Sequence, residues 1–415
     1  MRVLLLQSPT GRPEVPIYPV GLAFLAGQVR SHTLHGLDLS RYRDFSGELA
    51  STVGSYKPDV IAVSLRNIDD SSYPVTFSYV EPFSKVVRAP NEWNGALVVG
   101  GTGFSIYPDR ILELFPRIDY GIPGEGETVF PELLDHLENG TGVQGWDGGR
   151  LLPWRTSDLS VIRPPDYTIL DVSGYTAPDA IGIQSRRGCA YNCSYCTYGY
   201  LSGSSFRLRP LDHVLSDVES LEKMGVERFQ FVDSVFNAPR GYFLDLVQRL
   251  AERDGGAVWS AWVDENVKPE VFTLMREAGA VKVDFSPDAI SDRGLRLLSK
   301  RSTSDKLLPA VKAARKAGLQ VGINFFNNNP GEGFWSLIRK LLFMLRVRIA
   351  LGWGSTFVNI GTIRVYAHSP LAEKMKSEGM VEPDCDFFKP VFYRSAGPAD
   401  LLYRLFQKLK RIKHG

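Results

Sequence analysis

Short runs of consecutive apolar residues alternate with longer amphipathic stretches over most of the chain. In residues 1–140, a helix is predicted from Val20 to Ser31, and four strands are predicted at Val3–Leu6, Val60–Ser64, Ala96–Val99 and Ile118–Ile122. Continuous apolar strands that alternate with helices are typical of a parallel sheet covered on both faces. We therefore expect residues 1–140 to form a doubly wound, Rossmann-like α/β domain with ligands at the carboxyl ends of its strands.

The alternation stops at residue 141 and resumes at residue 181. Gly, Pro, Trp and Asp dominate residues 141–180, and Arg163-Pro164-Pro165 is incompatible with a helix interior, so we interpret this stretch as a linker. Six strands are predicted after it, at Ile181–Gln184, Arg228–Val232, Val258–Trp262, Val281–Phe285, Val321–Phe325 and Phe357–Val365. The helices between them are predicted at Leu211–Met224, Tyr242–Arg253, Pro269–Ala278 and Ser304–Lys316.

This second series of strands and helices predicts a partial (β/α)6 barrel over residues 181–370. Residues 371–415 are expected to form a short helical C-terminal extension that ends in a basic amphipathic helix, Leu401–Lys413. A solvated lid packed by its Leu and Phe face is the interpretation we favour for that helix over a membrane anchor.

Composition narrows the class of protein. Of 415 residues, 44% are hydrophobic and 23% are charged, which is typical of a globular protein and excludes a disordered or fibrous one. The net charge of +2 argues against a protein that mainly binds nucleic acid or an anionic membrane. The apolar runs are too short for a signal peptide or a membrane span, so we expect a cytoplasmic protein.

Three of the four cysteines, Cys189, Cys193 and Cys196, stand close together after a predicted strand. A backbone loop would let all three thiolates converge on one small object. Zinc takes four protein ligands in a structural site, or three plus water in a catalytic one. An iron–sulfur cube also takes four ligands, normally Cys, so three thiolates leave one iron open. Three incidental cysteines are the alternative, which their clustering disfavours.

The spacing Cys-x-x-x-Cys-x-x-Cys after the first barrel strand resembles the signature of the radical S-adenosylmethionine (SAM) enzymes. The resemblance implies that Cys189, Cys193 and Cys196 hold a [4Fe–4S] cluster and that SAM binds the fourth iron. It further implies an external one-electron reductant, which lets SAM yield a 5′-deoxyadenosyl radical that abstracts a hydrogen atom from the substrate. Tyr195 occupies the place of an aromatic residue that contacts adenine in the family.

Later strand ends match the same family more loosely. Asp233, Ser234 and Asn237 follow the second barrel strand, where the family holds the amino group of SAM. Asp288 lies where many relatives carry a Glu-Ser pair near SAM, and Asn324 ends the fifth strand. Polar residues at strand ends are often simply loop caps. Their order along the chain nevertheless favours the radical SAM barrel.

The first domain resembles the cobalamin-binding module that is fused to many such enzymes. Tyr18–Ala26 matches the first helix of the module, and residues 100–103 and 124–127 match loops that flank the nucleotide tail of the cofactor. Glycine in such loops lets the backbone approach a bulky ligand closely. A doubly wound domain without a cofactor is the alternative. The expected cobalamin contacts are Ser8, Ser64, Arg66, Asn67, Gly100, Gly101, Thr102, Gly103, Gly124, Glu125 and Gly126.

One departure from the module concerns the cobalt ligand. Many relatives carry Asp-x-His-x-x-Gly, whose His binds cobalt from below, but the corresponding stretch Leu37–Arg43 has no His. Either the cobalt has no imidazole ligand or the domain has lost the cofactor. Arg66 is a candidate for the space below the cobalt, and an ion pair of Arg66 with Asp69 or Asp70 is the alternative.

Two further residues have chemistry that the family pattern does not assign. His368 follows the sixth barrel strand, where it either takes a proton from the substrate or caps the loop, and we favour the cap. Cys385 stands alone, and a fourth cluster ligand there would block the binding of SAM. We therefore expect Cys385 to be a free thiol.

The sequence thus predicts a cobalamin-dependent radical SAM C-methyltransferase that methylates an unactivated carbon through a 5′-deoxyadenosyl radical and methylcobalamin. Its substrate is expected to be a small molecule or a protein or peptide side chain, with no nucleic acid and no membrane span involved. One alternative is a radical SAM dehydratase, cyclase or rearrangement enzyme without methyl transfer. Another, from a different class, is a non-catalytic iron–sulfur or corrinoid carrier protein.

Overall fold

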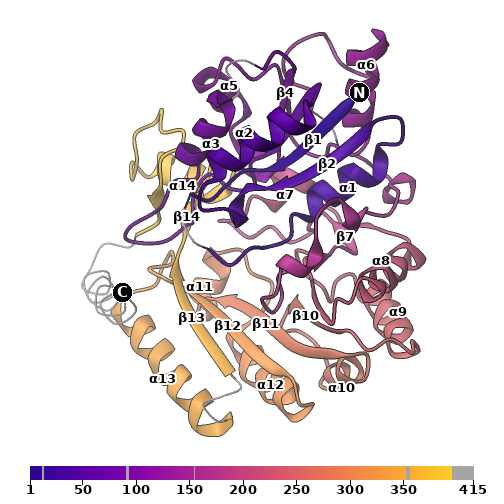
Figure 1. Cartoon of the computed structure of the whole chain (residues 1–415). Helices are drawn as coiled ribbons and strands as arrows, with labels where there is room; N and C mark the ends of the chain where they lie inside the picture. The colour runs from indigo at the N-terminus through magenta and orange to yellow at the C-terminus, as the bar shows by residue number, and fades with distance from the viewer. Residues whose placement is uncertain (12–13, 90–92, 154, 352–355, 395–415) are drawn as a thin grey trace. The chain divides into compact units, whose positions relative to one another are not determined.

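The computed structural model describes residues 1–11, 14–89, 93–153, 155–351 and 356–394 (Figure 1). The predicted helix Leu401–Lys413 lies outside these residues. The chain groups into two compact units, one made of residues 1–70, 77–186 and 207–229, the other of residues 71–76, 187–206 and the chain from residue 230 onward. Because these units interleave along the sequence, the boundaries expected at residues 140, 180 and 370 stay predictions.

The first unit contains a five-stranded parallel sheet in the order β2-β1-β3-β4-β5. Its strands are β1 (Arg2–Gln7), β2 (Thr33–Asp38), β3 (Val60–Ser64), β4 (Ala96–Gly100) and β5 (Tyr120–Ile122). The helices between and after them are α1 (Val20–Gln28), η1 (Leu39–Arg41), α2 (Phe45–Tyr56), α3 (Val80–Arg88), α4 (Thr102–Ile106), α5 (Pro108–Leu114) and α6 (Val129–Asn139). The predicted doubly wound fold is confirmed.

Burial explains why the sequence predicts four strands of this sheet but not β2. In β1 the side chains of Leu4, Leu5 and Leu6 are fully buried, as expected for an inner strand covered on both faces. The edge strand β2 alternates between exposed and half-buried positions over its first four residues, and it contains Gly36. It therefore lacks the continuous apolar run that predicted the other four strands.

The second sheet has six strands in the order β13-β12-β11-β10-β9-β6. They are β6 (Gly182–Ile183), β9 (Arg228–Phe231), β10 (Val258–Val263), β11 (Ala280–Asp288), β12 (Gln320–Asn327) and β13 (Thr356–Thr362). The pairs from β10 to β13 are parallel. The predicted partial barrel is confirmed, and the sixth predicted strand divides into β13 and the short β14 (Arg364–Val365).

The helices that alternate with these strands are α7 (Tyr198–Ser202), α8 (Leu211–Lys223), α9 (Arg240–Ala251), α10 (Glu270–Glu277), α11 (Asp292–Leu297), α12 (Ser304–Lys316), α13 (Phe334–Leu351) and α14 (Pro370–Ser377). Two-residue strands complete this part, with β7 (Arg186–Arg187) and β8 (Arg207–Leu208) in one pair and β14 and β15 (Val391–Phe392) in the other. The sequence did not predict α7, α11 or α13, whereas α14 lies in the expected helical C-terminal extension.

The segment between the two series of strands is built from three 3-10 turns, η2 (Leu159–Val161), η3 (Tyr167–Ile169) and η4 (Val172–Gly174). Each begins with an Asp whose carboxylate accepts the N–H of a Ser or Thr two residues later, at Asp158, Asp166 and Asp171. The hydroxyl of Tyr18 donates to the carbonyl of Tyr167 over 2.8 Å. These turns order the segment within the first unit, and its role as a linker between domains stays a prediction.

A buried ion pair holds α8 in the first unit. Arg209 Nη1 lies 2.5 Å from Asp217 Oδ2, and both side chains are 1% exposed. The same nitrogen donates to the carbonyl of Gln184 over 2.7 Å, and the guanidinium lies 5.0 Å from the ring centroid of Phe24. Removal of one partner would leave the other charge buried without compensation.

We predict that Asp217→Ala lowers the free energy of unfolding by about 3–5 kcal/mol, because the guanidinium of Arg209 stays buried without its counter-charge. Urea denaturation followed by circular dichroism measures this change. Glu219→Ala, an exposed change on the same helix, is the control and should alter stability by less than about 0.5 kcal/mol. A wild-type denaturation midpoint for Asp217→Ala would show that the pair is not a structural requirement.

Candidate functional site

The three clustered cysteines lie on the loop between β7 and α7. Gly188 opens this loop with a φ of +77°, and a Cβ atom there would lie 2.1 Å from the carbonyl oxygen of Ser205. Only glycine fits such a position. Cys189 N donates to the carbonyl of Gly203 over 3.0 Å, and Ser234 Oγ donates to that of Gly188 over 2.8 Å. These contacts fix the start of the loop.

The environment of Cys193 and Cys196 opposes the ionisation of these two thiols in the protein alone. Burial raises the pKa of Cys193 to about 12 and also raises that of Cys196, and the charges of the neighbouring cysteines add to both shifts. The ammonium of Lys300 works in the opposite direction, and Tyr198 N donates to Cys196 Sγ over 3.4 Å. Thiolates at Cys193 and Cys196 therefore need a bound cationic centre.

A site for a single metal ion needs a different geometry from a site for a cluster. Within the described part of the chain, no three Cys, His, Asp or Glu side chains gather closely enough to hold one metal ion. In an iron–sulfur cube the thiolates bind different irons, so they need not converge on one point. The donor set of three sulfurs on a glycine-initiated loop fits a cube better than a mononuclear zinc site.

A buried charge pair lies beside the cysteine loop. Asp288 is 2% exposed, ends β11, and places Oδ2 2.8 Å from Lys300 Nζ and 2.6 Å from the hydroxyl of Tyr195, which donates to it. Burial works against the charge of Lys300, but the carboxylate of Asp288 and the thiol of Cys193 outweigh it and raise the pKa of the ammonium. Sequence reasoning missed Lys300, which follows α11, because its pairing with Asp288 at the end of β11 depends on how the chain turns between them.

The same carboxylate orients the aromatic ring proposed for adenine. Tyr195 is half-buried, and its ring packs edge-on against Phe326 with centroids 5.1 Å apart. The hydrogen bond to Asp288 fixes the other end of the side chain. The adenine contact itself stays a prediction.

The residues expected around the amino group of SAM brace loops in this structure. Asp233 is buried after β9, and Ser234 holds Gly188 as described above. Asn237 Nδ2 donates to the carbonyl of Asp264 over 3.0 Å, and Asp264 N donates to Asn237 Oδ1 over 2.8 Å. Asn237 thereby ties the loop after β9 to the loop after β10. Their contacts with SAM stay predictions.

On β12, Asn324 Nδ2 donates to the carbonyl of Phe285 over 3.3 Å, and Asn324 Oδ1 accepts from Asn359 Nδ2 over 3.2 Å. Sequence reasoning also missed Lys340, which is fully buried in α13, forms an ion pair with Glu332, and donates to the carbonyl of Phe326 over 2.6 Å. This pair fixes the loop that leads from β12 into α13.

The two unassigned residues have structural surroundings. The ring of His368 stacks on that of Tyr200 at a centroid distance of 3.9 Å, which is consistent with a loop-stabilising role. Cys385 is a half-buried free thiol at the border of an apolar cluster that includes Leu371 and Met375.

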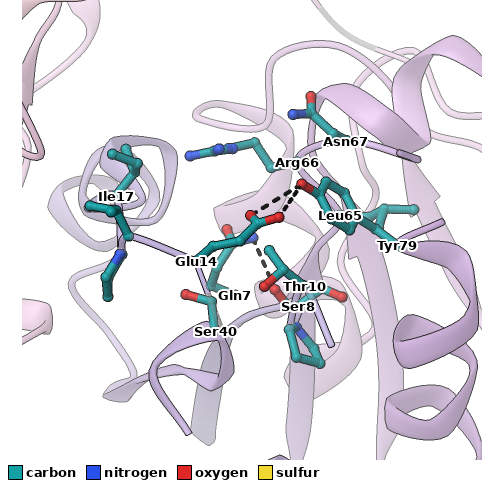
Figure 2. A pocket seen from close by; sticks show the side chains of 13 residues that line it. Gln7, Ser8, Thr10, Glu14, Ile17, Ser40, Leu65, Arg66, Asn67 and Tyr79 are labelled. Carbon is teal, nitrogen blue, oxygen red and sulfur yellow. Dashed lines mark hydrogen bonds between the residues drawn. The ribbon is translucent and has the colours of Figure 1, made fainter. Parts of the chain in front are cut away.

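In the first unit, an open hollow lies at the carboxyl ends of β1 and β3 (Figure 2). Gln7 and Ser8, 8% and 3% exposed, line it. Gln7 Oε1 and Ser8 Oγ have no hydrogen-bond partner among the described residues. Buried polar atoms are almost always paired, so these two mark a place where a ligand is expected to complete the site.

Arg66 and Asn67, both exposed, line the same hollow, and Figure 2 shows the guanidinium of Arg66 extending over it. Within the described residues Arg66 has no ion pair with Asp69 or Asp70, and Asp70 Oδ1 instead accepts the N–H of Phe77 over 2.9 Å. The alternative interpretation of Arg66 as an ion-paired residue is therefore not supported. The described residues that line the hollow include no His.

Backbone packing alone requires glycine at two positions that were expected to contact the cofactor. A Cβ atom on Gly101, whose φ is +93°, would lie 2.8 Å from the carbonyl oxygen of Leu65, and one on Gly103 would lie 2.7 Å from the carbonyl carbon of Asn67. Glycine here lets the turn after β4 pack directly against the loop that carries Arg66. The turn thus positions that loop, whether or not its glycines touch a ligand.

The other predicted cofactor contacts lie as follows. Glu125 binds Arg207 in a buried ion pair, and Glu125 Oε2 accepts Thr156 N over 3.0 Å, so its carboxylate is engaged within the protein. The remaining placements are Ser64 at the end of β3, Gly100 at the end of β4, Thr102 exposed at the start of α4, Gly124 bonded through N to Ser105 Oγ, and Gly126 against Leu25. A cofactor role for each stays a prediction.

Family models match both sites. The model of the radical SAM superfamily matches residues 183–341, which include the three cysteines, and that of the B12 binding domain matches residues 10–134, which include Arg66. The chain thus combines a radical SAM domain with a B12 binding domain. Its cofactors are therefore a [4Fe–4S] cluster, SAM and cobalamin.

Methyltransferases are among the relatives and solved structures that this chain resembles. An uncharacterized methyltransferase of Pyrococcus horikoshii is 27% identical over 355 residues, which cover 80% of this chain and 75% of the relative. The hopanoid C-3 methylase of Methylococcus capsulatus is 24% identical over 322 residues, or 74% of this chain and 60% of the relative. Cyclases are also among the relatives.

The radical SAM methyltransferase TsrM from Kitasatospora setae, solved with tryptophan and a SAM analogue, has the same fold with a TM-score of 0.80. It is 22% identical, and the match covers 91% of this chain and 76% of that one. Across the described residues, no helix combines the length and the apolar character needed to cross a bilayer.

We predict that Cys193→Ala abolishes the iron–sulfur cluster, because two thiolates cannot hold it. Anaerobic reconstitution with iron and sulfide should give about four irons per chain for the wild type and a small residue for the variant. Cys385→Ala, which removes the thiol outside the cluster loop, is the control and should keep the full visible absorption. Wild-type iron content in Cys193→Ala would contradict the assignment of the loop.

Proposed function

We propose that the protein is a C-methyltransferase that methylates an unactivated carbon of its substrate. The observation that carries this proposal is the presence, in one chain, of a three-cysteine radical SAM site and a B12 binding domain with a polar hollow at its strand ends. The resemblance to methylases supports it. The matches cover 75% and 60% of the length of these two relatives, so a shared activity is part of the proposal.

Each site would hold its own cofactor. Cys189, Cys193 and Cys196 would bind the cluster, and Gln7, Ser8 and Arg66 would face the corrinoid. When bound, the cluster with SAM supplies hydrogen-atom abstraction, and the corrinoid supplies the methyl group. The chain itself fixes the loops that carry these residues, through Gly188 for the cysteines and through Gly101 for Arg66.

Arg66 gives the hollow a property that suits methyl transfer. A guanidinium stays protonated and has no lone pair to donate to a metal. Beside a bound corrinoid, such a group would supply a positive charge without donating electrons to the cobalt. The absence of His from the described lining of the hollow fits a site without an imidazole ligand.

The substrate remains a small molecule or a protein or peptide side chain in this proposal, and the enzyme needs an external one-electron reductant. The test uses the anaerobically reconstituted enzyme with SAM that carries a CD3 group, a chemical reductant and a panel of candidate substrates. Mass spectrometry should find a product that has gained one CD3 group together with 5′-deoxyadenosine. The deoxyadenosine with an unlabelled, rearranged or cyclised product would favour the second candidate, to which the cyclase relatives point.

We predict that Arg66→His places an imidazole within reach of the cobalt, since Arg66 lines the hollow. Electron paramagnetic resonance of the cob(II)alamin-loaded wild type should show no nitrogen splitting from a lower ligand, and the variant should show a three-line splitting. Glu81→His, an exposed change on α3 outside the lining of the hollow, is the control and should give the wild-type spectrum. Identical spectra for Arg66→His and wild type would place Arg66 away from the cobalt.

A further inference from the structure

Glu265 is a buried carboxyl group to which the proposed chemistry gives no role. It follows β10, and the register that pairs Val263 with Phe285 of β11 puts it at the same sheet edge as Asp288. Its side chain is 4% exposed, and Oε1 has no hydrogen-bond partner among the described residues. A buried carboxylate oxygen without a donor is costly, so its retention needs an explanation.

The residue before Glu265 is held in place. Asp264 exchanges two hydrogen bonds with the side-chain amide of Asn237, at 3.0 and 2.8 Å, and its carboxylate accepts Asn266 N over 2.8 Å. The backbone on the N-terminal side of Glu265 is therefore fixed before any ligand arrives. Such preorganisation is typical of binding groups, because it lowers the entropic cost of association.

The charges near Glu265 favour the binding of a cation. Burial raises the pKa of Glu265 to about 7, and Lys300 lowers it while Asp264 and Asp288 raise it. Lys300 is already bound by Asp288 at 2.8 Å and by the carbonyl of Ser286 at 2.6 Å. Two buried carboxyl groups thus share this lysine, and the surplus of negative charge favours a positively charged ligand at Oε1.

We infer that Glu265 is the counter-charge for the cationic methionine group of SAM. The sulfonium is the group of SAM that keeps its positive charge when the amino group binds iron, so it is the group that the carboxylate would face. Lys300, which acts on both Glu265 and Cys193, links this carboxylate to the cysteine loop where SAM binds in this family. The inference concerns binding of SAM to the barrel and does not require that methyl transfer be the outcome.

The test measures affinities of the anaerobically reconstituted enzyme for SAM and for S-adenosylhomocysteine, which keeps the amino group but lacks the sulfonium charge. Glu265→Gln should bind SAM about 10- to 100-fold more weakly, the effect of losing a charge-assisted contact. If the carboxylate faces the sulfonium, the affinity for S-adenosylhomocysteine stays the same. An equal loss of affinity for both ligands would contradict a contact with the sulfonium. Unchanged affinity for both ligands would overturn the inference.

Asp264→Asn is the matched control, because it removes the adjacent negative charge and keeps an acceptor oxygen for Asn266. It should change SAM affinity by less than about threefold, as expected for a half-buried neighbour outside the contact. An equal loss in Asp264→Asn and Glu265→Gln would show that general charge, and not Glu265 itself, attracts SAM.

The pH dependence of binding gives a second measurement. The groups that act on the ionisation of Glu265 are Lys300, Asp264 and Asp288. Because the carboxyl ionises near pH 7, wild-type affinity for SAM should rise between pH 6 and pH 8. The rise should be absent in Glu265→Gln, and its persistence there would contradict the inference.

Stability separates a binding role from a structural one. The pKa of Glu265 is raised by folding, so above neutral pH its ionised form disfavours the folded state. Glu265→Gln removes that penalty and should raise the thermal unfolding temperature at pH 8 before cluster reconstitution. A lower unfolding temperature would assign Glu265 to the structure and not to a ligand.

Discussion

Parallel strand pairing is the constraint on which both candidate sites depend, because it brings the carboxyl ends of distant strands to one edge of a sheet. In the first sheet, Gln7 pairs in register with both Asp38 and Ser64, so the loops that follow these strands meet at the hollow. In the second sheet, the register of β10, β11 and β12 does the same for the loops that carry Glu265 and Asp288. The sites are thus consequences of topology, and the loops supply their chemistry.

Burial then sorts the polar groups at these edges into two kinds. Asp288 with Lys300, and Glu332 with Lys340, are buried pairs that satisfy each other and hold loops in place. Gln7, Ser8 and Glu265 keep a buried oxygen without a donor or acceptor among the described residues. A folded protein tolerates such atoms where a ligand completes them, so the second kind indicates binding and the first indicates support.

The sequence alone predicted the strands and the site that depend on a local pattern of residues. Inner strands such as β1 and β3 have continuous apolar runs, which predicted them. The spacing of the three cysteines indicated an iron–sulfur cluster. The edge strand β2 was missed because it alternates and contains Gly36, and α13 was missed because Lys340 and Arg346 interrupt its apolar stretch. The pairing of Lys300 with Asp288 is set by tertiary packing, which no local pattern reveals. Gly101 and Gly103 were predicted for a ligand, yet packing against the loop after β3 already requires them.

Reconstitution with both cofactors tests the central claim most directly. The purified chain would be loaded anaerobically with iron, sulfide and hydroxocobalamin, desalted, and analysed for metals and visible absorption. About four irons and one cobalt per chain, with the broad absorption of a cluster, are the expected result. Iron without retained cobalt would contradict cobalamin-dependent methyl transfer and leave a radical SAM enzyme that works without a corrinoid.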